Sequence, residues 1–192
     1  MLNNENMKTK SNKFKKISGL CDFACRKIDE SQNIKRFLKY QTKSPLSQSS
    51  IDLSGDVIVQ PDILESLEEI NIFNEMFYEN MISDARNYIF IYSPYSKFKG
   101  VTGMVRLNID ILTAVKYNKL KYGEETRINQ IANYISDMFD GYTIENDFIT
   151  EIIGSPKMEI VGDKQYRLSK TNDYKVFSIE IDIDILCGRS KV

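Results

Sequence analysis

Apolar and polar residues alternate along residues 176–186 more regularly than anywhere else in the chain. From Phe177 to Ile185 every second position is apolar, and serine, glutamate or aspartate stands between. Residues 105–111 follow the same rule, with valine, leucine and isoleucine against arginine, asparagine and aspartate. A period of two predicts a strand with one buried face. We therefore expect both segments in an antiparallel sheet.

Residues 87–93 are predicted as a further strand, and because both of its faces are bulky we expect it to be covered on both sides. Pro94 is expected to end it, and residues 97–103 are expected to form a hairpin loop. Three short strands are expected later, the last two separated by Gly162 and Asp163. They span residues 147–153, 157–161 and 164–168.

Helical spacing of apolar residues marks four other segments. Residues 17–28 carry the first amphipathic stripe, and residues 31–40 carry a shorter one. Residues 61–70 begin with proline and acidic residues, which favour the first turn of a helix. In residues 126–139 we expect the first threonine to cap the helix and Gly141 to follow its end.

The order of these elements predicts an α+β fold, with a mostly antiparallel sheet, helices packed on one face and a helical segment near the N-terminus. Residues 1–16 hold five lysines and are expected to form a basic flexible arm. Residues 17–192 are expected to form a single α+β domain. The lysines of the arm, which could serve assembly or contact DNA, are Lys8, Lys10, Lys13, Lys15 and Lys16.

Charge is unevenly distributed along the 192 residues, although the net charge is only −1. Residues 1–50 hold 11 lysines and arginines against 4 acids, whereas the remainder holds 15 against 23. Such segregation suggests that one part meets an anionic partner while the rest repels it. No apolar run approaches the ~18 residues of a membrane span, so no membrane contact is expected.

The chain contains no histidine, which removes the usual general base of serine and cysteine nucleophile systems. Neither GxxxxGK[ST] nor GxGxxG occurs. Cys21, Cys25 and Cys187 do not have the spacing of a zinc site, so we expect three unpaired thiols and no metal. We therefore expect a protein that is not an enzyme and needs no cofactor.

Four carboxylates form the one acidic cluster with a geometric basis, because residues two apart on a strand share a face. They are Asp110, Glu180, Asp182 and Asp184. We favour a solvated sheet face, with an electrostatically useful surface and a Mg²⁺ site as the alternatives. Two other segments stand out: residues 92–122, where basic residues are interleaved with aromatic ones, and a possible interface segment. The latter contains Phe73, Met76, Phe77 and Tyr78.

The order of particular segments resembles a known class of proteins. After the basic helix come "NIKRFLKYQTKSPLS", "QPDIL", "IFIYSPY", "VRLNIDIL" and "TRINQIANYISDMFDG", and an isoleucine-rich strand closes the chain. This layout is similar to the neck and tail-completion proteins of tailed bacteriophages, the tail terminators and head-to-tail connectors.

The resemblance implies a structural virion protein, made in the host cytoplasm, that forms a ring of six or twelve copies. The ring would join the tail to the capsid portal, contact neighbouring neck and tail proteins, and let DNA pass without binding it specifically. Acids lining its lumen would keep DNA sliding, because each neutralised phosphate adds affinity.

Two alternatives stay open. One is an accessory protein that binds nucleic acid through residues 1–16 and 97–121. The other is a histidine-free Mg²⁺-dependent nuclease built on the carboxylate strand.

Overall fold

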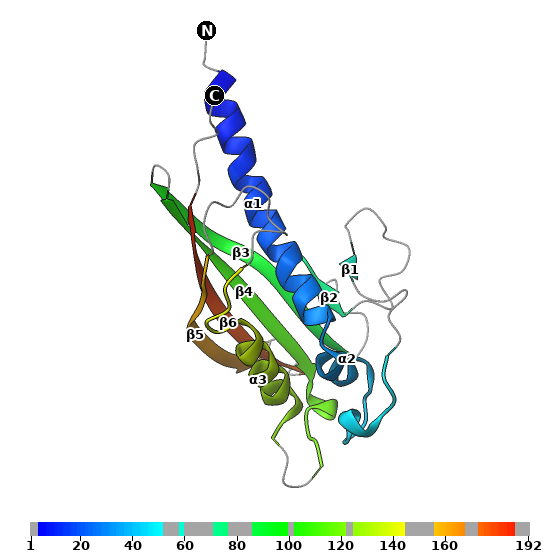
Figure 1. Ribbon diagram of the computed structural model, residues 1–192. Helices are drawn as coiled ribbons and strands as arrows, with labels where there is room; N and C mark the ends of the chain where they lie inside the picture. Colours follow the sequence, from blue (N-terminus) through cyan, green and yellow to red (C-terminus); the bar gives the residue numbers. More distant parts are fainter. Residues whose placement is uncertain are drawn as a thin grey trace.

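The computed structural model (Figure 1) describes residues 4–51, 58–59, 71–76, 86–99, 102–121, 125–144, 156–167 and 173–186. Side chains are described from residue 17 onward, except those of Ile58, Val59 and Leu186. The helices are α1 (Asn4–Asp29), α2 (Gln32–Lys39) and α3 (Arg127–Phe139), with short 3-10 turns η1 (Pro45–Ser47) and η4 (Val115–Tyr117). The strands are β1 (Ile58–Val59), β2 (Ile72–Phe73), β3 (Asn87–Lys99), β4 (Thr102–Ala114), β5 (Met158–Arg167) and β6 (Tyr174–Leu186).

The described strands form one sheet in the order β1-β2-β3-β4-β6-β5. The short strands β1 and β2 run parallel to β3, whereas β3, β4, β6 and β5 pair antiparallel to one another. All three helices lie on one face of the sheet, the helix-covered face (Figure 1). We call the opposite face the outer face. The predicted α+β fold, with a mostly antiparallel sheet and helices on one side, is confirmed.

The main core lies between the helices and the helix-covered face. Alternate residues of the long strands are fully buried there, such as Ile109 on β4 and Ile181 on β6. The stripe predicted in α1 packs against them, because Leu20, Ala24 and Ile28 are also fully buried. Two long strands with period-two patterning and one amphipathic helix therefore place the core where the sequence predicted it.

Cys21 and Cys25 are buried on α1 as free cysteines. Burial raises the pKa of Cys21 to about 12 and raises the pKa of Cys25 further above its ordinary value. Both thiols therefore stay protonated at neutral pH, and they pack as small apolar side chains. Cys187 lies outside the described residues.

The backbone of α1 begins at Asn4, ten residues before Phe14, where the apolar pattern starts. Once the packed part of a helix exists, each further residue adds a hydrogen bond without a new nucleus, so the helix can continue through polar sequence. The segment expected to be a flexible arm is therefore helical from residue 4. The side chains of its five lysines lie outside the described residues, and the role of the arm stays a prediction.

Two predicted strand ends are wrong, and both coincide with bulges. β3 continues through Pro94 to Lys99, with a register shift between Tyr92 and Tyr95. A proline is tolerated there because a bulge leaves one residue out of the ladder. Likewise, the two strands expected around Gly162 form one strand, β5, with a bulge just before that glycine.

The start of α3 also differs from the prediction. Thr126 makes no capping hydrogen bond with its side chain, and Asn118 accepts the N–H groups of both Arg127 and Ile128 instead. Gly141 follows the end of the helix with a φ of 73°, as expected for a glycine at that position. The helix expected over residues 61–70 and the strand expected over 147–153 lie outside the described residues.

Candidate functional site

The predicted acidic residues lie together on the outer face of the sheet. The strand register pairs Arg106 with Asp182, Asn108 with Glu180, and Asp110 with Ser178. Asp184 follows on the same face of β6, where it is exposed. All four predicted acids therefore share one face, as the alternation along β4 and β6 requires.

Arg106 links two of these acids. Its Nε lies 2.7 Å from Asp182 Oδ1 and its Nη2 lies 2.9 Å from Oδ2, so the guanidinium binds that carboxylate with two bonds. Its Nη1 donates to Glu180 Oε2 at 3.1 Å, and Lys164 Nζ lies 3.9 Å from the other oxygen of Glu180. The hydrogen bonds to Asp182 raise the pKa of Arg106 above its ordinary value. Two of the four predicted acids, Glu180 and Asp182, thus belong to an ion-pair network that spans β4, β6 and β5.

This pairing decides what the carboxylates can do. Both oxygens of Asp182 and one oxygen of Glu180 already accept hydrogen bonds from a single guanidinium. Such oxygens would have to leave Arg106 before they could bind Mg²⁺. In the described part of the chain, no three cysteine, aspartate or glutamate side chains are grouped so that they could hold a metal ion.

Asp110 differs from the other acids because only 5% of it is exposed. Tyr92 donates its hydroxyl to Asp110 Oδ2 at 3.0 Å, and the Ser178 hydroxyl donates to Oδ1. Burial, together with the charge of Asp110, raises the pKa of Tyr92 to about 12 and also raises the pKa of Tyr166. Both phenols therefore stay neutral at physiological pH, and Tyr92 remains a donor to the carboxylate. Asp110 is a hydrogen-bonded structural residue inside the outer face.

Aromatic residues occupy the far end of the same face. Phe73 of β2 stacks on Phe90 of β3 with ring centroids 4.9 Å apart, and Tyr88 and Tyr174 pack beside them. The outer face therefore changes along the strands from buried aromatic residues, through the hydrogen-bonded Asp110, to the partly exposed ion pairs of Arg106.

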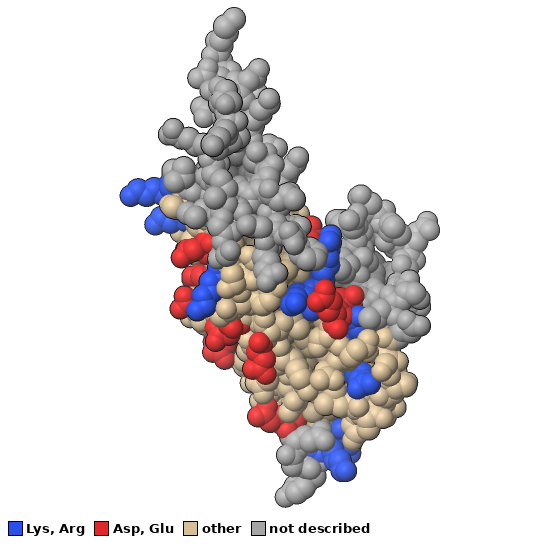
Figure 2. Space-filling view, in the orientation of Figure 1, with Lys and Arg blue, Asp and Glu red and all other residues tan. Residues whose placement is uncertain are grey.

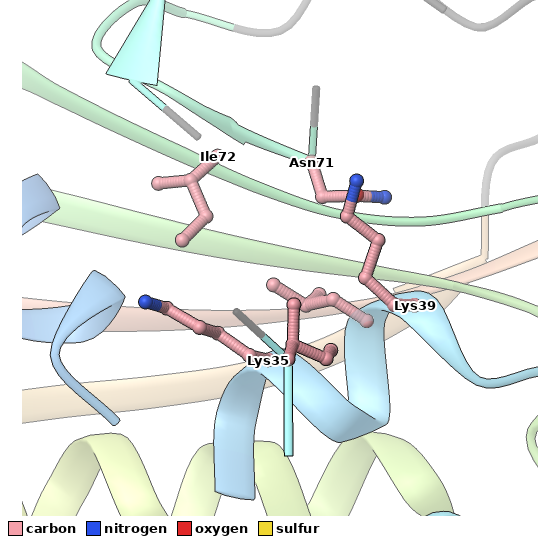
Figure 3. A pocket seen from close by; sticks show the side chains of 6 residues that line it. Lys35, Lys39, Asn71 and Ile72 are labelled. Atoms are coloured by element: carbon pink, nitrogen blue, oxygen red, sulfur yellow. The ribbon is translucent and has the colours of Figure 1, made fainter. Parts of the chain in front are cut away.

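A second candidate is a small pocket between α2 and the start of β2 (Figure 3). Lys35 and Lys39 reach it from α2, and Asn71 and Ile72 from the other side. The pocket offers about 10 Å³, which is room for about one water molecule. Lys35 is only 2% exposed, and its Nζ lies 2.9 Å from Asp29 Oδ1. The pocket is thus too small for a substrate, and one of its two ammonium groups is held by a carboxylate.

A family model matches residues 31–183, which include Asp110, Glu180 and Asp182 of the outer face and both pocket elements. The chain belongs to the YomW family. YomW is a Bacillus phage-region protein. A search of curated proteins finds no match.

The YomW match begins at Ser31, directly before α2, and ends within β6. It therefore covers Arg106, Glu180 and Asp182, whereas α1 and the predicted arm precede it. Among the helices that the structure describes, none has the length and apolar character needed to cross a membrane.

The other predicted residues of this YomW-family chain are not gathered in one place. Phe73 is buried in the aromatic end of the outer face, whereas Met76 is 54% exposed, and Phe77 and Tyr78 lie outside the described residues. The basic and aromatic residues of 92–122 are also divided. Arg106 is engaged by acids, and Lys116 lies over the ring of Tyr117 on η4.

Sequence reasoning missed two buried cations. Arg127, at the start of α3, is fully buried and donates to the carbonyl oxygens of Tyr117, Phe37, Tyr40 and Thr42. Burial lowers its pKa to about 10. Lys35 is buried beside Asp29. The sequence contains one indication of the burial of Arg127, which is its position directly before the apolar stripe of a helix. Exposed polar residues are as common at that position as buried ones, so the burial could not be predicted.

Proposed function

We propose that this YomW-family protein is a structural component of a tailed-phage virion, a subunit of the neck or tail-top ring that joins the tail to the capsid portal. It works by assembly rather than by catalysis. The phage association of the family and the layout of helix, antiparallel sheet, helix and closing strand both support this proposal.

The observation that carries the proposal is the mutual engagement of charges on the outer face. Arg106 binds Asp182 with two hydrogen bonds and Glu180 with a third, so both carboxylates already have a partner within the sheet. Asp182 and Glu180 therefore do not form a free carboxylate pair for Mg²⁺, and Arg106 is not free to bind phosphate. This arrangement suits a wall along which DNA moves, because phosphate contacts would add salt-dependent affinity and hence friction.

Native mass measurement of the full-length protein tests the proposal against its two rivals. A closed assembly of six or twelve copies that does not shift duplex DNA at physiological salt is the expected result. A monomer that shifts DNA under those conditions would favour the nucleic-acid-binding accessory protein. Mg²⁺-dependent cleavage that Asp182→Asn abolishes, and that the control Asp137→Asn on the exposed side of α3 retains, would favour the nuclease.

The N-terminal arm provides a second test of assembly. Residues 1–16 hold five lysines, whereas the rest of the chain is acidic, so weak charge contacts between neighbouring subunits can add up around a ring. We expect deletion of residues 1–13 to leave thermal unfolding of the monomer almost unchanged and to weaken assembly, most visibly at raised salt. Equal assembly of the truncated and full chains at every salt concentration would contradict this role.

A further inference from the structure

β5 forms one end of the sheet, so one of its sides pairs with no described strand. The first part of that side is covered: Met158 donates its N–H to the carbonyl of Tyr142 at 2.8 Å, and its carbonyl accepts from Gly141 at 3.0 Å. Residues 163–167, which we call the open edge, are all exposed and have no such described neighbour on that side. Figure 2 shows acidic side chains, with basic ones among them, along the side of the molecule where Figure 1 places β5.

The direction of the backbone groups along the open edge follows from the register. Met158 lies across from Ile183 of β6 and turns its N–H and C=O away from β6. In an antiparallel pair, every second residue does the same. Beyond the bulge, the residues across from odd-numbered positions of β6 are Asp163, Gln165 and Arg167. These three residues therefore direct their backbone donors and acceptors outward, a ready template for another strand.

We propose that the open edge pairs antiparallel with the open edge of a second copy of this chain, which gives a two-fold dimer. The partner is a second copy because the sequence of the edge is complementary to itself in one register. When Gln165 faces its own counterpart, Asp163 faces Arg167 at both ends, and Lys164 faces Tyr166. In this register, residues whose backbone donors and acceptors point outward face residues of the same kind on the other copy, as an antiparallel ladder requires.

The two neighbouring registers that keep the same alignment of hydrogen bonds both lose the pairing of Asp163 with Arg167. One places Lys164 directly opposite Lys164, which destabilises a strand pair. The other places Tyr166 opposite Tyr166 and Arg167 opposite Gln165. A lysine on an edge strand often prevents pairing. Here, however, Lys164 Nζ lies 3.9 Å from Glu180 on the outer face of its own subunit. The edge also exposes apolar surface, since 41% of Tyr166 and 45% of the adjacent Val161 are accessible.

The proposed dimer does not depend on the proposed ring, because a two-fold contact is complete with two copies and needs no further subunits. Both six and twelve are even, so a ring can contain such pairs while another surface closes it. Five residues on each strand make a small contact, which places the dimer among weak associations. We therefore expect the dimer fraction to rise over about 10 µM to 1 mM protein.

Sedimentation velocity of the full chain across that concentration range tests the pairing. Gln165→Pro removes an outward N–H at the centre of the proposed ladder, and an edge strand tolerates proline where its N–H faces solvent. We expect this variant to keep the wild-type circular dichroism spectrum and to raise the dimer dissociation constant about tenfold or more. Equal assembly masses for the variant and the wild type at each concentration, or a wild type that stays monomeric throughout, would overturn the proposal.

A charge exchange tests the register and does not depend on how the proline variant folds. Asp163→Arg and Arg167→Asp each place like charges opposite one another and should weaken the dimer. The double variant restores opposite charges and should recover it. Glu159→Arg makes the same change of charge on β5 outside the open edge and should leave the dimer unchanged. Equal weakening by the double variant and the single variants would overturn the proposed register.

Discussion

Arg127 supports the strongest stability prediction. Its guanidinium is fully buried and binds carbonyl oxygens in α2, just after α2 and in η4, which ties these segments to the start of α3. Substitution by methionine, which keeps an unbranched apolar stem, removes these bonds. The Phe37 carbonyl still accepts from Asn87 at 3.0 Å, so three carbonyls lose their side-chain donor.

The expected magnitude follows from two opposing effects. An acceptor left unsatisfied costs about 1–3 kcal/mol, so three cost about 6 kcal/mol in the middle of that range. Against this, the variant no longer buries a charge. Burial lowers the pKa of Arg127 from 12.5 to about 10, which corresponds to a cost of about 3 kcal/mol. We therefore expect Arg127→Met to reduce the free energy of unfolding by about 3 kcal/mol, or the melting temperature by about 6–12 °C.

Urea unfolding followed by circular dichroism measures this loss, provided the denaturant slope stays unchanged. Arg36→Met is the matched control, because Arg36 lies on α2 and makes two exposed hydrogen bonds, to Leu46 and Ser50. We expect that control to cost under about 1 kcal/mol. Indistinguishable unfolding free energies for the two variants would refute the reasoning about Arg127.

The remaining predictions concern the outer face and the thiols. A double-mutant cycle with Arg106→Gln and Asp182→Asn should give a coupling energy of about 1 kcal/mol in urea unfolding, since the pair is partly exposed; a coupling of zero would contradict the network. The raised pKa of Tyr92 means that its contribution to stability is complete below pH 10 and is lost as the pH rises towards about 12. The tyrosinate absorbance difference between the wild type and Tyr92→Phe should accordingly have a midpoint near 12, whereas a midpoint near 10 would argue against its burial beside a carboxylate. In thiol titration at pH 8, Cys21 and Cys25 should react only after unfolding, and the denatured, unreduced chain should give three thiols without zinc; fewer thiols or stoichiometric zinc would disprove this.

The fold could be predicted where one physical signal dominates. The alternation in 176–186 and 105–111 gave the two central strands, because a strand with one covered face must alternate. Pro94 and Gly162 misled because proline and glycine usually interrupt strands, whereas here they sit at bulges. Whether a bulge can accommodate such a residue depends on how the neighbouring strand pairs with it. The local sequence carries no information about that pairing.

The site could be predicted only in part. The shared face of the four acids follows from spacing along a strand, and the structure contains it. The partner of Asp182 and Glu180 could not be predicted, because Arg106 is more than seventy residues away and meets them only through the register of β4 and β6. The burial of Asp110 was equally hidden, since an aspartate between isoleucines has the same pattern on a solvated face as beside Tyr92 and Ser178.

Quantitative mass spectrometry of purified particles of a tailed phage that encodes this protein tests the central claim most directly. If the chain is a subunit of the neck or tail-top ring, the particles should contain six or twelve copies each, and these should remain after washing at high salt and nuclease treatment. Detection of the chain in the infected lysate but not in the purified particles would contradict a structural role in the virion.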